Sequence, residues 1–173
     1  MNMARELIPA VLCKDEISTR ERCKSLHGLV DWVQIDVLDG TLYPYRSWSE
    51  AKTIESWQLP YSLELHLMVR NPEKYIEAWK GVSTFKRVIW HIEANIDHQA
   101  LIKKVKGMGR AVGLAISPHT SLEILLPYLE SIDRILILGV TPGQSGQTLI
   151  PETVKTVKKF AQMKQHPTIA FDG

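Results

Sequence analysis

Short apolar segments recur along the chain at nearly regular intervals, and amphipathic segments of helical length separate them. Most of the apolar segments are near-continuous runs of Val, Ile and Leu, which is typical of parallel strands covered on both faces. The pattern therefore predicts a series of buried strands. They span residues 7–12, 32–37, 62–69, 87–93, 111–117, 134–140 and 168–172.

The segments between the predicted strands begin with residues that favour helix starts. Asn71 offers a capping side chain, Pro72 suits the first turn, and Glu73 places an acid early in the helix. Thr120 is followed by Glu123 at the spacing of a capping box. The predicted helices span residues 15–26, 71–80, 97–108, 120–129 and 151–163.

Strands that alternate with helices predict the α/β class, and two architectures compete within it. An open doubly wound sheet that binds a dinucleotide would carry a G-x-G-x-x-G loop after its first strand, and this sequence has none there. Polar residues follow nearly every predicted strand, and a (β/α)8 barrel uses all its strand ends for one site. We therefore expect a TIM barrel.

The chain is short for that barrel. A complete barrel needs about 200 residues or more, whereas this sequence has 173 and stops after its seventh predicted strand. We expect one domain over residues 1–173 that lacks the eighth βα unit and is incomplete at its C-terminus. The first and seventh strands would then have unpaired apolar edges, which favour assembly into a homo-oligomer.

Composition and charge argue against several classes of partner. Hydrophobic residues make up 45% of the chain and charged residues 23%, and the net charge of +2 is too small to indicate nucleic acid. No apolar run reaches the roughly 20 residues of a membrane span. Cys13 and Cys23 are too few for a disulfide framework, and residues 1–6 lack the apolar core of a signal peptide. We expect a cytoplasmic protein with free thiols and no membrane partner.

Three predicted strands carry residues that can bind a cation or transfer a proton. Asp36 lies near the end of the second strand, before the turn residues Asp39 and Gly40. His66 lies in the third strand, and Asp172 ends the seventh. In a parallel barrel the carboxyl ends of the strands meet at one face. Two carboxylates and an imidazole at that face predict a small metal or proton-transfer site.

Short motifs accompany these strand ends along the whole chain. They are Ile8-Pro9-Ala10-Val11-Leu12, Asp36-Val37-Leu38-Asp39-Gly40, His66-Leu67-Met68-Val69, Asn71-Pro72-Glu73-Lys74-Tyr75, His91-Ile92-Glu93-Ala94, Gly113-Leu114-Ala115-Ile116-Ser117-Pro118, Val140-Thr141-Pro142-Gly143-Gln144-Ser145-Gly146-Gln147 and Phe171-Asp172-Gly173. In this order and at these spacings, the sequence resembles the ribulose-phosphate 3-epimerase family over essentially its whole length.

The resemblance implies an isomerase of carbohydrate metabolism, in the pentose phosphate pathway, that interconverts D-ribulose 5-phosphate and D-xylulose 5-phosphate. Inversion at C3 requires two acid–base groups on opposite faces of a near-planar enediolate, and Asp36 and Asp172 match those catalytic positions. The resemblance further implies a divalent cation of the Zn, Fe, Mn or Co class. Asp36, His66 and Asp172 would be its ligands.

The resemblance also implies a sugar-phosphate substrate bound beside these residues. The phosphate would rest on the backbone N–H groups of a glycine-rich loop, where the lack of a Cβ permits close approach. Gly173 would begin a second phosphate-binding turn. The implied substrate-binding residues are His66, Met68, Gly143, Gln144, Ser145, Gly146 and Gly173.

Several positions depart from the family's pattern. Gln34 stands where a metal-binding His is usual, and Ala10 replaces a Ser that contacts substrate. Leu38 and Leu138 replace methionines near the reacting centre. Gln34 is either a substitute ligand or a filler. A second hypothesis is therefore an impaired relative that keeps only the barrel and sugar-phosphate binding.

Two further interpretations remain open from the sequence. His91 and Glu93 end the fourth predicted strand, and they either orient metal ligands or serve structural hydrogen bonds. A decarboxylase or aldolase acting on a sugar phosphate is a third function class on this barrel. Such relatives need an Asp-x-Lys pair on the third strand, where this chain has Glu64-Leu65-His66.

Overall fold

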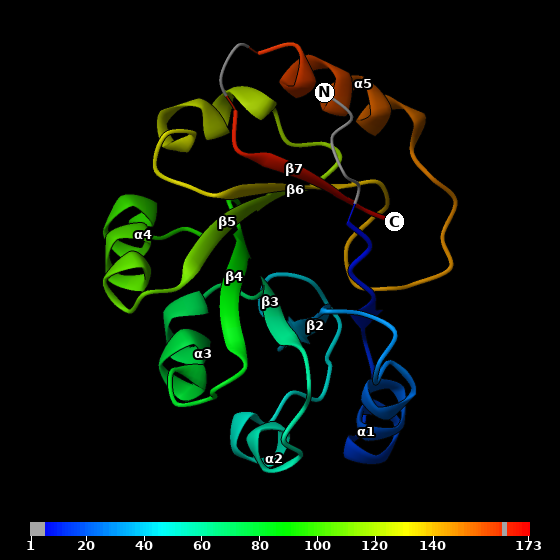
Figure 1. Cartoon of the computed structure of the whole chain (residues 1–173). Helices are drawn as coiled ribbons and strands as arrows, with labels where there is room; N and C mark the ends of the chain where they lie inside the picture. The colour runs from blue at the N-terminus through cyan, green and yellow to red at the C-terminus, as the bar shows by residue number, and fades with distance from the viewer. Residues whose placement is uncertain (1–5, 164–165) are drawn as a thin grey trace.

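The computed structural model describes residues 6–163 and 166–173, and its centre is one curled sheet of seven parallel strands (Figure 1). The strands are β1 (Ala10–Val11), β2 (Trp32–Leu38), β3 (Ser62–Met68), β4 (Phe85–His91), β5 (Ala111–Ile116), β6 (Arg134–Leu138) and β7 (Thr168–Asp172). Helices cover the outside of the curl (Figure 1). They are α1 (Glu16–Ser25), α2 (Ala51–Ser56), α3 (Pro72–Trp79), α4 (His98–Gly107), the 3-10 helix η1 (Leu122–Tyr128) and α5 (Pro151–Ala161).

The strands are hydrogen-bonded in the order in which they follow each other in the sequence, from β1 to β7. An open doubly wound sheet would instead reverse its strand order at a switch point. The prediction of a TIM barrel lacking its last unit is therefore confirmed, and the doubly wound alternative is wrong. Within the described residues, β1 pairs only with β2 and β7 only with β6.

Alternation along the strands divides the buried side chains into two layers. Val33 and Ile35 of β2 belong to the large apolar layer between the sheet and the helices. Ile89 and Leu136 belong to a smaller apolar cluster on the concave side. The intervening buried positions of β2 and β3 are polar, and they are Gln34, Asp36, Glu64 and His66.

An ion-pair network links strands near the amino-terminal end of the sheet. The buried Glu64 of β3 accepts a hydrogen bond from Arg87 of β4, and its Oε2 lies 3.5 Å from Arg134 Nη1 of β6. Arg134 Nη2 in turn donates to Glu6 Oε2 over 3.0 Å. The Arg87 guanidinium lies 4.2 Å from the ring centroid of Trp32. The network therefore joins β2, β3, β4, β6 and the segment before β1.

Most of the predicted helix starts are confirmed by their caps. The side chain of Asn71 accepts a hydrogen bond from the backbone N–H of Lys74 at the start of α3. Asp97 accepts one from the backbone N–H of Ala100 at the start of α4. Asp15 caps α1 in the same way. Each side chain satisfies a backbone donor that has no partner within its helix.

Three elements differ from the sequence predictions. The first strand forms a ladder over only two residues, although residues 7–12 are apolar. The segment 120–129 forms η1 rather than an α-helix, because Pro127 lies inside it and no capping side-chain bond forms. Helix α2 was not predicted, since it is only six residues long and buries just Ala51 and Ile54.

The structure can be compared with the expectations about membranes and thiols. None of the helices in the described ranges is long and apolar enough to cross a membrane. Cys13 and Cys23 are both free and buried, in agreement with the expected thiols. The expectation that no signal peptide begins the chain falls largely on residues 1–5, which lie outside the described residues.

Candidate active site at the carboxyl ends of the strands

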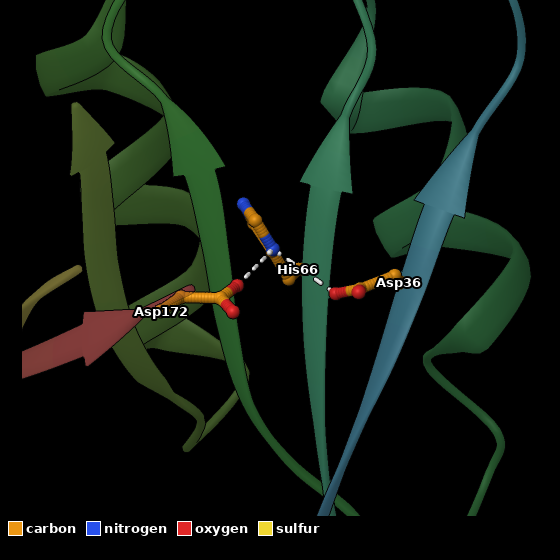
Figure 2. A group of neighbouring side chains, drawn as sticks. All are labelled: Asp36, His66 and Asp172. Carbon is orange, nitrogen blue, oxygen red and sulfur yellow. Dashed lines mark hydrogen bonds and ion pairs between the residues drawn. The ribbon is translucent and has the colours of Figure 1, made fainter. Parts of the chain in front are cut away.

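Asp36, His66 and Asp172 converge at one point although they come from three different strands (Figure 2). His66 Nδ1 lies 3.0 Å from Asp36 Oδ1 and 3.7 Å from Asp172 Oδ2. One ligand atom of each residue lies within 4.8 Å of the other two. The three residues predicted separately on the second, third and seventh strands therefore form one cluster.

The strand register explains why these side chains meet. Asp36 of β2 is paired directly with His66 of β3, so the two residues leave the sheet side by side. Asp172 is the last residue of β7 and is paired with Leu138 of β6. The curl of the sheet turns β7 back toward β2 and β3, and the three side chains point at one another (Figure 2).

Negative charge in the cluster shifts the proton affinities of its members. Burial lowers the pKa of His66, but the hydrogen bond and charge of Asp36 outweigh it and raise that pKa above its ordinary value. Burial raises the pKa of Asp172, and the charge of Asp36 contributes to the rise. A raised pKa lets a carboxyl hold a proton nearer to neutral pH, which suits acid–base chemistry.

The donor set fits a divalent cation of the transition-metal class. Ligand atoms about 2.0–2.2 Å from one ion lie roughly 3–4 Å apart, and the distances of 3.0 and 3.7 Å from His66 Nδ1 fall in that range. Two carboxylates and an imidazole are a donor set that suits Zn, Fe or Mn. A cation would also offset the negative charge that raises the pKa of His66.

Gln34 points its amide into the same cluster. Its Nε2 donates to Asp36 Oδ1 over 2.8 Å and to Asp172 Oδ2 over 3.4 Å, and lies 3.5 Å from His66 Nδ1. Rotating the amide by half a turn would place Oε1 at the same point, and the two orientations are distinguished only by their hydrogen bonds. Gln34 is thus positioned for either of the two roles inferred from the sequence, filler or ligand.

A cavity of about 260 Å³ opens beside the cluster. All the residues that the sequence singled out for the site line it. They are Asp36, His66, Met68, Gly143, Gln144, Ser145, Gly146, Asp172 and Gly173. The departing positions Ala10 and Leu138 line the same cavity and make that part of the wall apolar.

The glycine-rich loop after β6 lines the same cavity as the ends of β2 and β3. Gly143 and Gly146 have φ values of 113° and 77°, which residues with a Cβ rarely adopt. A Cβ on Gly143 would lie 2.1 Å from the ring of Tyr45, so that ring packs directly on the loop. Gln147 Nε2 donates to the carbonyls of Thr141 and Gln144 and holds the loop closed.

Sequence reasoning did not identify the part played by two of these loop residues. The closing hydrogen bonds of Gln147 and the packing of Tyr45 depend on loop conformations that no hydrophobic period encodes. The same holds for Tyr43, whose hydroxyl reaches His91 of β4 and Ser117 after β5.

The fold and the cluster define a TIM-barrel protein with two carboxylates and an imidazole gathered at the carboxyl ends of its strands. A model of the ribulose-phosphate 3 epimerase family matches residues 6–173. The chain belongs to this family.

Individual relatives agree with the family match. The chain is 33% identical over 146 residues to the ribulose-phosphate 3-epimerase of Schizosaccharomyces pombe, covering 80% of this chain and 61% of that protein. It is 35% identical over 152 residues to the Chlamydia pneumoniae enzyme of the same name, covering 83% and 65%. The cytoplasmic isoform of Oryza sativa subsp. japonica is 31% identical over 178 residues, covering 98% and 75%. The chain thus spans less than two thirds of the first two relatives.

Proposed function

We propose that this chain is an epimerase that inverts C3 of a ketose phosphate, converting D-ribulose 5-phosphate to D-xylulose 5-phosphate. The observation that carries the proposal is the convergence of Asp36, His66 and Asp172 beside the glycine-rich loop. Family membership and the names of the relatives support the same reaction. The cluster and the loop would hold the two ends of one small substrate.

The two carboxylates supply the acid–base chemistry of the proposal. Asp36 of β2 and Asp172 of β7 both line the cavity, and each would face one side of a sugar bound there. One carboxylate removes the C3 proton as a base, and the other, protonated, delivers a proton to the opposite face. Each such transfer contributes about 10²–10⁴-fold to the rate.

Asp36, His66 and Asp172 would hold a divalent cation, with Gln34 Oε1 as a fourth donor. Bound there, the cation would stabilise negative charge that develops on the substrate's oxygens. An amide oxygen is a harder donor than imidazole, so Gln34 favours Mn or Fe over Zn within the expected class. His66 keeps its ring fixed, because it is fully buried and contacts both carboxylates.

The glycine-rich loop would bind the phosphate. Gly143 and Gly146 place no Cβ of their own beside the backbone N–H groups of the loop, and Gly173 lines the same cavity. His66 and Met68 border the sugar between the phosphate and the acids. Gln144 and Ser145 lie at the loop's tip and line the same space.

One observation favours the alternative of an impaired relative. The Gln34 amide hydrogen-bonds both carboxylates and so lies where the cation would bind. A protein in which this amide keeps its present orientation would bind the sugar phosphate without turnover. Phosphate binding without metal uptake would identify this second function.

The test of the proposal is conversion of D-ribulose 5-phosphate in D2O, followed by NMR, with Mn²⁺, Fe²⁺, Co²⁺ and Zn²⁺ supplied in turn. The expected result is D-xylulose 5-phosphate with deuterium at C3. Asp36→Asn serves as the matched control, since it keeps an oxygen donor but removes the base. Absence of exchange at C3 with every metal would rule the proposal out.

The setting of this activity belongs to the same proposal. We place the enzyme in the cytoplasm and in the pentose phosphate pathway, and the name of the rice relative states a cytoplasmic isoform for that protein. Assembly into a homo-oligomer also remains a prediction, motivated by the exposed Leu7 and Phe171 near β1 and β7. Sedimentation of the purified chain tests it.

A further inference from the structure

A chain of hydrogen bonds leaves the cluster on the side of His66 that faces away from Asp36. His66 Nε2 lies 3.0 Å from His91 Nε2, and both imidazoles are fully buried. The far nitrogen of the second ring, His91 Nδ1, lies 3.0 Å from Glu93 Oε2. His66 is thus connected through one intervening ring to a carboxylate that does not line the cavity of the cluster.

Glu93 is held in this position from the neighbouring strand. Its Oε1 accepts the backbone N–H of Ser117, just after β5, over 2.8 Å. Burial raises the pKa of Glu93, but the hydrogen bond from His91 and the other donors around it outweigh burial and lower that pKa to about 2. Glu93 is therefore a carboxylate that accepts with both oxygens and donates with neither.

In the series of hydrogen bonds from His66 through His91 to Glu93, the charged state of Glu93 decides which nitrogen of each imidazole carries a proton. Glu93 requires a donor, so His91 carries its proton on Nδ1 and presents a bare Nε2. That nitrogen can only accept, so His66 must carry its proton on Nε2. With its proton held on Nε2, neutral His66 would offer the lone pair of Nδ1 to a cation bound beside Asp36 and Asp172; without a cation, a proton on Nδ1 is donated to Asp36. The neutral ring is the state in which an imidazole binds a metal ion.

The opposite arrangement, with the proton of His91 on Nε2, is unfavourable when a cation is bound in the cluster. A cation on His66 Nδ1 leaves the proton of that ring on Nε2, facing His91. If His91 also carried its proton on Nε2, two donors would meet over 3.0 Å in a buried place. The Glu93 carboxylate avoids this conflict, because it draws the proton of His91 to Nδ1 as a charged acceptor, which the neighbouring Tyr43 hydroxyl is not.

We propose that Glu93 is a positioning residue that acts through His91 and fixes the tautomer of His66 for cation binding. The proposal rests on the metal site of the proposed function. It needs two acceptors at residue 93, one for Ser117 and one for His91, and a carboxylate is the side chain that supplies both. Outer partners of this kind are typically worth 10–100-fold in metal affinity.

Glu93→Gln tests the proposal with almost no change in shape. The amide has one acceptor and one donor group, so it cannot satisfy both the Ser117 N–H and His91 Nδ1–H. We expect Zn²⁺, used as a diamagnetic probe, to bind the variant about 10–100-fold more weakly than the wild type. The affinity is measured by competition with a chelator on the full chain.

Tyr43→Phe is the matched control. The Tyr43 hydroxyl also lies 3.0 Å from His91 Nδ1, and it shares a hydrogen bond with Ser117 Oγ. The substitution removes this hydroxyl but keeps the Glu93 carboxylate. Its removal is expected to weaken Zn²⁺ binding by less than about tenfold. Long-range ¹H–¹⁵N NMR of the Zn²⁺-loaded wild type reads the tautomers directly. Protons are expected on Nε2 of His66 and Nδ1 of His91.

The outcomes separate this inference from the proposed function. Wild-type protein that takes up no Zn²⁺, Mn²⁺ or Co²⁺ overturns the metal site and the inference with it. A loaded wild type with the proton of His91 on Nε2 overturns the inference alone, even if Glu93→Gln does not fold. So does a folded Glu93→Gln variant that binds Zn²⁺ as tightly as the wild type.

Discussion

At the scale of single residues, the site is defined by which acid faces which side of the cavity. Asp36 and Asp172 share one imidazole, yet they come from β2 and β7, which are not neighbours in the sheet. In the proposed reaction, a substrate held between them would contact a different carboxylate on each face. The proposed inversion at C3 depends on this arrangement more than on the identity of the cation.

Asp172→Asn separates proton removal from inversion. The variant keeps an oxygen donor but loses the second acid–base group, so Asp36 returns a proton to the face from which it took one. We expect interconversion to fall by roughly 10²–10⁴-fold while C3 of one epimer still exchanges with D2O. Asp36→Asn should retain exchange only of the other epimer. NMR of each epimer in D2O measures the exchange at C3. If either variant interconverted the epimers as fast as the wild type, the acid–base roles of Asp36 and Asp172 would be contradicted.

At the scale of elements, the strand ends are coupled through side chains that bridge neighbours. Glu93 follows β4 and binds the backbone after β5, while His91 of β4 contacts His66 of β3. One part-buried carboxylate therefore ties β3, β4 and β5 together near the cluster. This coupling has a consequence for stability in acid.

The low pKa of Glu93 predicts an acid-dependent part of the stability. The ordinary value is 4.5 and the folded value is about 2, so in this interval the unfolded chain binds more protons than the folded one. The contribution is fully present above pH 4.5 and is lost as pH falls toward 2. Urea unfolding of wild type and Glu93→Gln at several pH values should show a stability difference that shrinks over this window. A constant difference would contradict the prediction.

Helix α4 depends on its N-terminal cap. Asp97 accepts the backbone N–H of Ala100 over 3.0 Å. Asp97→Ala should lower the free energy of unfolding by about 1 kcal/mol. Glu50→Ala is the control, because Glu50 precedes α2 without a capping side-chain bond. Equal losses in the two variants, measured by urea denaturation, would show that the cap is not the cause.

The elements that the sequence predicted well are those with long apolar runs or clear caps. The strands from β2 to β7 and helices α1, α3, α4 and α5 follow from hydrophobic period and cap residues. Helix α2 and the short β1 depend on tertiary packing, and Pro127 turned a predicted α-helix into η1.

The candidate site was predictable in part for a similar reason. Asp36, His66 and Asp172 lie on strands, and parallel strands bring their carboxyl ends to one face. The contacts of Tyr43 and Gln147 depend on loop conformation, which local sequence does not determine. The direction of the Gln34 amide likewise follows from its neighbours in space.

At the scale of the whole molecule, a buried ion-pair network links parts of the sheet that are far apart in sequence. Glu64 is the acid between Arg87 and Arg134, and Arg134 reaches Glu6 before β1. Two buried guanidinium nitrogens, on Arg87 and Arg134, have no hydrogen-bond partner in the described part of the chain. Arg87 therefore depends on Glu64 for its ion pair, whereas Arg134 pairs with both Glu64 and Glu6.

Glu64→Gln tests that dependence. Removing one partner of a buried pair leaves an uncompensated charge, and we expect a loss of about 3–5 kcal/mol in the free energy of unfolding. The exposed pair of Glu123 with Lys159 offers the control, and Glu123→Gln should change stability little. Urea denaturation measures both variants. Equal, small effects would mean that the network does not hold the sheet together.

The central claim is that three strand ends place Asp36, His66 and Asp172 around one cation. The most direct measurement is the anomalous diffraction of crystals of the chain grown with Mn²⁺. We expect one strong peak within bonding distance of Asp36 Oδ1, His66 Nδ1 and Asp172 Oδ2, with the Gln34 amide turned to present its oxygen. Saturating Mn²⁺ without a peak among these three residues would contradict it.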